Sequence, residues 1–200
     1  MLTVCPDPVV VESQLASGAL SCPCGGRLGP WAWARPRVIG RCDRRVRVVP
    51  RRSRCRSCRV THVLLPTIAL VRRADLVEVI GRALGLRAAG WGQRPIAALL
   101  GVPRSTVRGW LARFTRRAEM IRAHFVAWVV WLAGDVGRDA SSGSPLADAV
   151  TAIVRAARAA AGVVGLDRWQ FAAAATGGRL LGDTTAPFPA PWTPTTLAGR

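Results

Sequence analysis

The sequence predicts a mainly α-helical protein with a small β unit at its N-terminus, and three observations lead to this fold class. Strand-like segments, Val46–Val49 and Val60–Leu65, lie within the first 66 residues. Residues 74–133 carry apolar side chains at helical spacing, and a second helical pattern begins at Pro145. A chain of 200 residues is also long enough to bury a real core.

The chain is strongly basic. It has 29 basic residues, all of them arginine, and 11 acidic residues, which gives a net charge of +18. Such an excess favours a polyanionic partner, nucleic acid first and an anionic membrane surface second. We see no signal peptide, and the most apolar run, Phe125–Ala133, is too short for a membrane span of ~20 residues. We therefore expect a cytoplasmic protein without a membrane segment.

The segment from Gln93 to Trp110 has the residue pattern of a helix-turn-helix. A small residue, Ala97, stands where two helices cross, and Gly101 stands at the turn, where a positive φ is needed. Pro103 suits the first turn of the following helix. Apolar residues occupy the inward positions, namely Ile96, Leu100, Val102, Val107 and Trp110.

A further helix is expected before this segment, which makes the unit trihelical and homeodomain-like. The helix is predicted to open at Asp75, with Glu78 three residues later completing a capping box. Gly81 and Gly85 weaken the pattern, because each costs about 1 kcal/mol relative to alanine. Gly90 and Gly92 are expected to end the helix.

The second helix of such a unit lies in the major groove of DNA, with its N-terminal residues against base edges. Arginine can donate two hydrogen bonds to guanine, which contributes about 1–3 kcal/mol of discrimination. Threonine can reach a base or a phosphate, and glycine lets the backbone approach closely. The alternative is that these arginines only solvate the helix. The predicted DNA-binding residues are Arg104, Ser105, Thr106, Arg108, Gly109 and Arg113.

Cysteine pairs in the first 66 residues indicate a structural zinc site of the zinc-ribbon type. Cysteines in a reducing compartment are poor candidates for disulfides, and four thiolates close a tetrahedral site. The predicted ligands are Cys22, Cys24, Cys55 and Cys58. Because the first pair is one residue shorter than a usual knuckle, either the hairpin adapts, or Cys42 or His62 replaces a ligand, or zinc has been lost. Cys5 is not expected to be a ligand.

An arginine-rich run lies between the two cysteine pairs. Residues 35–59 contain eleven arginines and one acid, Asp43. Part of the run alternates basic and apolar residues, as a strand with one basic face does, and backbone phosphates are its natural partner. A solvated loop is the alternative.

Two helices and a proline-rich tail are expected after the helix-turn-helix. Ser144 suits an N-cap and Pro145 the first helical position of a helix that extends to about Gly162. A short helix is expected over 168–175, followed by a glycine stop. The stripe formed by Ile121, Phe125, Trp128 and Leu132 is expected to pack either on a second copy, as a homodimer, or on the 145–162 helix.

The joined segments CPCGGRLGPWAWARPR, CRSCRVTHVLLP, IAALLGVPRSTVRGWLARF and TGGRLL resemble an uncharacterised family of bacterial helix-turn-helix proteins with a zinc-ribbon-like start. Many members are similar to the N-terminal recognition part of insertion-sequence transposases. The resemblance covers roughly residues 20–182 and implies DNA binding, but no catalytic residue or target site. The sequence departs from the family at the short Cys22–Cys24 pair.

These patterns predict six segments along the chain. They are an N-terminal arm (1–19), a zinc-ribbon-like domain (20–66), a helix-turn-helix domain with a following helix (74–133), a linker (134–144), C-terminal helices (145–182) and a disordered tail (183–200).

The function predicted from the sequence is sequence-specific binding of double-stranded DNA, without an active site or a small-molecule substrate. The protein would act as a transcriptional regulator or as an accessory of a mobile element. Two alternatives stay open: a transposase module whose catalytic domain lies in another chain, and an RNA-binding zinc-ribbon protein. The first would need a cluster of metal-binding carboxylates, which the acids after the helix-turn-helix do not offer.

Overall fold

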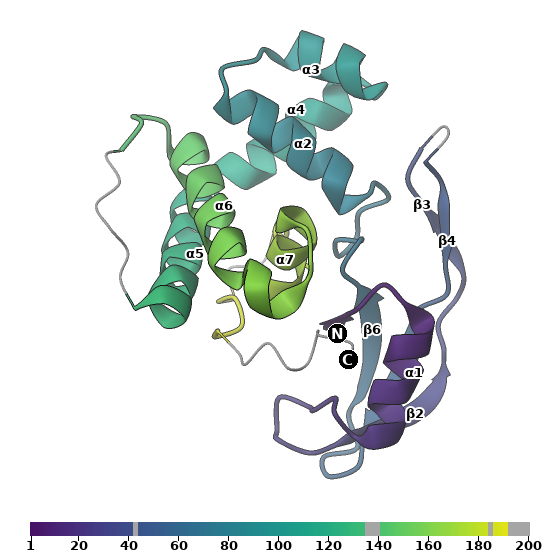
Figure 1. Cartoon of the computed structure of the whole chain (residues 1–200). Coiled ribbons are helices and arrows are strands. Elements are labelled where there is room, and N and C mark those ends of the chain that lie inside the picture. Colours follow the sequence, from purple (N-terminus) through teal and green to yellow (C-terminus); the bar gives the residue numbers. More distant parts are fainter. Residues whose placement is uncertain (42–43, 135–140, 184–185, 192–200) are drawn as a thin grey trace.

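The computed structural model describes residues 1–41, 44–134, 141–183 and 186–191, and it is mainly α-helical with a small N-terminal β unit, as predicted (Figure 1). The β unit consists of β1 (Leu2–Val4), α1 (Pro8–Ser17), β2 (Leu28–Trp33), β3 (Arg37–Ile39), β4 (Val46–Val48), β5 (Arg51–Cys55) and β6 (Thr61–Pro66). The helices that follow are α2 (Val77–Ala88), α3 (Gln93–Leu100), α4 (Arg104–Thr115), α5 (Ala118–Ala133), α6 (Pro145–Val164) and α7 (Arg168–Ala175).

The β unit is a four-stranded sheet with one helix on one of its faces. The strand order is β1-β6-β5-β2, in which β1 runs parallel to β6 and the other pairs are antiparallel. Helix α1 lies across the sheet (Figure 1), and its Val11 and Leu15 pack with Leu28, Leu64 and the buried side of the cysteine pairs.

Residues 1–19, predicted to be an arm, form strand β1 and helix α1 instead. Asp7 caps the helix by accepting a hydrogen bond from the Val9 N–H at 2.8 Å, and Pro8 stands in the first turn. Gly18, with φ of 73°, ends it. The cap and the buried pair Val11 and Leu15, four residues apart, are local helix signals, whereas the pairing of β1 with β6 is a long-range contact.

The strands β3 and β4 form a separate hairpin that extends from the sheet alongside α2 (Figure 1). At the turn between the two strands, the Nε of Arg41 donates to the Asp75 carboxylate at 2.6 Å, and Arg44 lies 3.9 Å from Glu78. The predicted capping box of α2 is therefore wrong. The helix begins at Val77 without a side-chain cap, because the buried Asp75 carboxylate is held by Arg41.

Helices α2, α3 and α4 form the predicted trihelical unit, and their inward side chains join one large apolar core with α5, α6 and α7. Gly81, which looked like a weakness of α2, is required there. A Cβ at this position would lie 2.0 Å from Cδ2 of Trp169, so the indole of α7 packs directly on the helix backbone.

Helices α5, α6 and α7 lie next to one another beside the helix-turn-helix (Figure 1). Ile121, Phe125 and Trp128 are completely buried in the core shared with α6 and α7, where the rings of Phe125 and Trp128 lie 6.2 Å and 5.2 Å from the ring of Phe171. Ser144 caps α6 by accepting from the Ala147 N–H, with Pro145 in the first turn, as predicted. The predicted helix over 168–175 is observed as α7.

The predicted linker and tail fall partly outside the described residues. Positions 135–140 of the linker, and 184–185 and 192–200 of the tail, are among those not described. The described part of the tail makes contacts with the helices. The ring of Phe188 lies 4.9 Å from that of His124, and the Arg117 guanidinium lies 4.5 Å from the centre of the Phe188 ring.

Candidate nucleic-acid interface and metal centre

The turn of the helix-turn-helix has the geometry that its sequence requires. Gly101 adopts φ of 62° and ψ of 33°, a left-handed conformation that glycine takes at little cost. The N–H of Val102 donates to the Ala97 carbonyl at 3.1 Å and closes the turn. Pro103 is extended and immediately precedes the first residue of α4. The two helices are therefore held at a fixed angle by the backbone itself.

Helix α4 has one buried face and one exposed face. Val107, Trp110, Leu111 and Phe114 are buried and follow the helical spacing i, i+3, i+4 and i+7. Leu111 and Phe114 were not singled out in the sequence, although this spacing identifies them. Among the predicted contact residues, Arg104, Ser105 and Arg108 are exposed, and Thr106, Gly109 and Arg113 are half-buried.

Arg113 differs from the arginines at the start of α4, because it has partners within the chain. Its Nη1 donates to the Gly109 carbonyl at 3.1 Å, and its Nε lies 3.6 Å from the carboxylate of Asp183. The same carboxylate lies 3.4 Å from Arg116 and 3.8 Å from Arg73. Asp183 belongs to the segment predicted to be a tail, and nothing in its local sequence signals this contact.

The comparisons with known proteins agree with this geometry. Residues 77–120 match the family model of a homeodomain-like domain. No curated protein and no solved structure matches the chain. The matched residues begin with α2 and end just inside α5, so the match covers the whole trihelical unit and the recognition helix. This part of the chain is a homeodomain-like helix-turn-helix, a domain that supports DNA binding in general.

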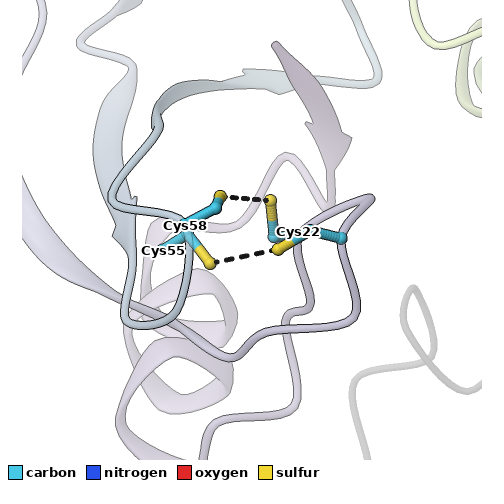
Figure 2. A group of neighbouring side chains, drawn as sticks. Cys22, Cys55 and Cys58 are labelled. Carbon is cyan, nitrogen blue, oxygen red and sulfur yellow. Dashed lines mark hydrogen bonds between the residues drawn. The ribbon is translucent and has the colours of Figure 1, made fainter.

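The four predicted zinc ligands meet at one point of the β unit. The sulfur atoms of Cys22, Cys24, Cys55 and Cys58 all lie within 4.8 Å of one another. The sulfur of Cys22 lies 3.7 Å from that of Cys58 (Figure 2), and the sulfur of Cys24 lies 3.5 Å from that of Cys55. Four thiolates placed ~2.3 Å from a zinc ion are ~3.8 Å apart in a tetrahedron. The arrangement is therefore compatible with a zinc site.

The short first pair fits because its loop adapts. The Cys22 N–H donates to the Gly26 carbonyl, and the Gly25 N–H donates back to the Cys22 carbonyl, both at 2.8 Å. Gly25 has φ of 83°, which tightens the loop and brings both sulfurs to the same side. Gly26 is also required, because a Cβ there would lie 2.7 Å from the Cys55 sulfur.

His62 contacts the cluster through one sulfur, since its Nε2 lies 3.2 Å from Sγ of Cys22. It is buried, and burial lowers its pKa, so the ring is neutral at pH 7. A neutral ring that donates its Nε2–H to the Cys22 sulfur would orient this ligand and support its thiolate. Cys5 lies outside the cluster among the described residues, and Cys42 is not described.

Cys55 and Cys22 differ in how readily their thiols lose a proton. At Cys55, burial raises the pKa, but the N–H groups of Cys58 and Ser57 outweigh it and lower the pKa to about 6. At Cys22, the N–H of Cys24 lowers the pKa, but burial and the neighbouring thiols raise it to about 12. The Cys55 sulfur is thus ready to bind a cation at neutral pH, whereas Cys22 needs the charge of that cation to lose its proton.

The arginine-rich run divides into bound and exposed side chains. Within the described residues, Arg41, Arg44 and Arg51 have carboxylate partners, at Asp75, Glu78 and Glu12. Burial along β4 does not follow the predicted alternation, because Val46 and Arg47 are both exposed and Val48 is buried. In the part of the chain that the structure describes, no helix is both long enough and apolar enough to cross a bilayer.

Proposed function

We propose that the protein binds double-stranded DNA in a sequence-specific manner, with α4 in the major groove, as a transcriptional regulator or an accessory protein of a mobile element. The observation that carries the proposal is the two-sided character of α4. Its apolar face is buried against α2 and α3, while Arg104, Ser105 and Arg108 project into solvent at its N-terminal end. These are the positions that face base edges in a docked helix-turn-helix.

The six predicted contact residues differ in their expected roles. Arg104 and Arg108 are the candidates for bidentate bonds to guanine, because their side chains are exposed and no ion pair to either is found among the described residues. Ser105 and Thr106 would contact a base or a phosphate. Gly109 and Arg113 act together, since the carbonyl of one accepts from the other.

The acidic residues after the helix-turn-helix support a binding role rather than a nuclease role. Glu119 binds Arg122, Asp148 accepts from Ser141 and Ser142, and Asp167 caps α7. Asp183 faces three arginines. Strand-transfer chemistry needs a group of carboxylates that holds metal ions. Among the described residues these carboxylates form no such group.

We also propose that zinc is held by Cys22, Cys24, Cys55 and Cys58 as a structural ion. With four protein ligands the site would have no open position for a substrate. The ion would join the loop after α1 to the β5–β6 turn, in a unit whose own apolar core is small. Metal analysis of the purified chain, and of Cys58→Ser, tests this. A wild-type chain that carries no zinc would refute it.

A homodimer stays a prediction. The apolar stripe of α5 that suggested it is packed inside the chain, in the core that α5 shares with α6. Mass measurement at two concentrations tests it, and a strict monomer would exclude it.

The DNA-binding proposal is tested by substituting one arginine on α4 and one elsewhere. The preferred site is first selected from random duplexes. Arg108→Ala should then weaken binding to that site by about 1–3 kcal/mol and relax one base position. Arg158→Ala, which removes the same charge from the exposed side of α6, is the matched control and should leave the preference intact. Equal losses of Arg108→Ala on specific and random duplexes would mean that Arg108 contacts only phosphate.

A further inference from the structure

Trp31 is exposed to an unusual degree for a tryptophan in a strand. Its exposed fraction is 56%, and it lies at a β-bulge between Pro30 and Ala32 in the pairing of β2 with β5. Bulges redirect side chains and are enriched next to functional sites. An indole left in water gives up the large stabilisation that its burial would supply. The bulge therefore turns outward a side chain that the fold does not use in its core.

The surroundings of Trp31 are basic. The Cζ of Arg54 lies 4.6 Å from the centre of the indole, and the Arg54 Nε donates to the Arg59 carbonyl at 3.1 Å, which holds the guanidinium in place. Arg52 and Arg54 alternate along β5 with the buried Ser53. Both therefore lie on the sheet face away from α1, and Thr61 of β6 pairs with Arg54 there.

The acids of the β unit lie elsewhere. Within the described part of residues 1–66, the carboxylates are Asp7, which caps α1, and Glu12, which lies within this helix across the sheet. The face formed by Trp31, Arg52, Arg54 and Thr61, here called the outer face, thus combines an open aromatic ring with guanidiniums and lacks a described carboxylate partner. Its charge is complementary to a polyanion with planar groups.

We infer that the outer face is a second nucleic-acid site, which binds an unpaired segment of DNA by stacking a base on Trp31. Bases in a duplex stack on each other and offer no free ring face to a flat sheet, whereas an unpaired base does. Arg54 strengthens the stack through its contact with the indole, and Arg52 neutralises the adjoining phosphate. The choice of DNA over RNA rests on the proposed function of α4, but the stacking geometry does not.

The chain provides a matched control two residues away. Trp33 is 53% exposed, and the Cζ of Arg51 lies 4.5 Å from its ring. However, the Nε of Arg51 binds the Glu12 carboxylate at 2.7 Å, and Trp33 pairs with Arg51 on the α1 side of the sheet. A carboxylate next to this second indole neutralises its arginine and repels phosphate. Trp33 is therefore an exposed indole next to an arginine, like Trp31, but its arginine is already paired with a carboxylate.

The experiment measures the anisotropy of a labelled oligothymidylate, which forms no duplex, with the full chain and its variants. Trp31→Ala should weaken binding by about 5- to 150-fold, the loss of one base stack, and Trp31→Phe should restore part of it. Trp33→Ala should bind like the wild type. Arg52→Gln should reduce the slope of log affinity against log salt by about 0.7. Thermal melting verifies that each variant is folded.

Four results would overturn the inference: no loss in Trp31→Ala, equal losses in Trp31→Ala and Trp33→Ala, an unchanged salt slope in Arg52→Gln, or tighter binding of an oligouridylate than of the DNA oligomer. The last would identify RNA as the ligand. Arg108→Ala separates this site from the proposed function, because it should lose duplex discrimination and keep oligothymidylate affinity. If Arg108→Ala leaves duplex binding unchanged while Trp31→Ala loses the oligomer, the role of α4 fails and the outer face stands.

Discussion

The contact between Asp183 and the C-terminal end of α4 leads to a quantitative prediction about DNA binding. The carboxylate lies 3.6 Å from Arg113, 3.4 Å from Arg116 and 3.8 Å from Arg73. Under the proposed function a DNA phosphate would contact these side chains, and the carboxylate competes with it for them. A bound duplex must therefore displace the carboxylate or accept its repulsion, so Asp183→Asn should increase the affinity for DNA.

The size of the effect follows from the exposure of the pairs. The Asp183 side chain is 64% exposed and that of Arg116 is 68% exposed, so this ion pair is largely screened by water, whereas the side chains of Arg113 and Arg73 are 36% and 19% exposed. A charge pair at 4 Å in water contributes ~1 kcal/mol, and measured surface pairs contribute about 0.2–1 kcal/mol. With one or two pairs released, Asp183→Asn should bind duplex about 1.4- to 30-fold more tightly at low salt. The gain should fall as salt rises.

The assay is a duplex titration at two salt concentrations, together with a thermal melt. Asp7→Asn is the matched control. It makes the same change of charge at an exposed carboxylate, and asparagine caps α1 as well as aspartate does. Asp183→Asn should bind DNA more tightly and melt at a slightly lower temperature, while Asp7→Asn changes neither by much. Equal gains in both variants would show an effect of net charge alone, and no gain in Asp183→Asn would refute the competition.

Three further predictions concern the turn, the metal site and pH. Gly101→Ala should destabilise the fold by about 1–2 kcal/mol, because Gly101 has φ of 62°, although open space surrounds it. Gly85→Ala in α2 should instead stabilise the fold by up to about 1 kcal/mol. Chemical denaturation measures both free energies of unfolding, and a change of the same sign in both variants would contradict the reasoning. His62→Ala should lower zinc affinity about 10- to 100-fold in a chelator competition, and an unchanged affinity would remove its role in orienting Cys22. Burial lowers the pKa of His124 below its ordinary 6.5, so the unfolded chain takes up the proton first and the free energy of unfolding should fall as pH drops below about 6.5. His124→Gln should flatten this dependence of stability on pH. A dependence that persists in the variant would assign it to other groups.

The helix-turn-helix could be predicted from the sequence because its determinants are local. The spacing of Ile96, Val102 and Val107 specifies the inward faces, and Gly101 specifies the turn, so the pattern is complete within twenty residues. The cysteine cluster could be predicted for a related reason. Thiols have few roles in a reducing compartment, and two close pairs restrict the geometry even though their loop was one residue short.

The rest depended on contacts between distant parts of the chain. Strand β1 pairs with β6 some sixty positions later, and a three-residue strand carries too little pattern to be recognised. Asp75 matched a capping box, but its partner Arg41 lies in another element and competes for the carboxylate. Phe188 contacts the ring of His124 from a segment whose prolines suggested disorder. Local composition does not encode these pairings.

The acidic residues decide which arginines are available to a nucleic acid, and the net charge alone does not. Glu12 binds Arg51 and Asp75 binds Arg41. Asp183 binds a group of arginines that includes Arg113. These cations serve the fold or must be released before they meet a phosphate. At the start of α4 and on the outer face of the sheet, the exposed arginines have no described carboxylate partner. The scarcity of acids, 11 against 29 arginines, therefore matters less than where the acids lie. These two basic surfaces have no carboxylate partner among the described residues, so their charge is available to a polyanion.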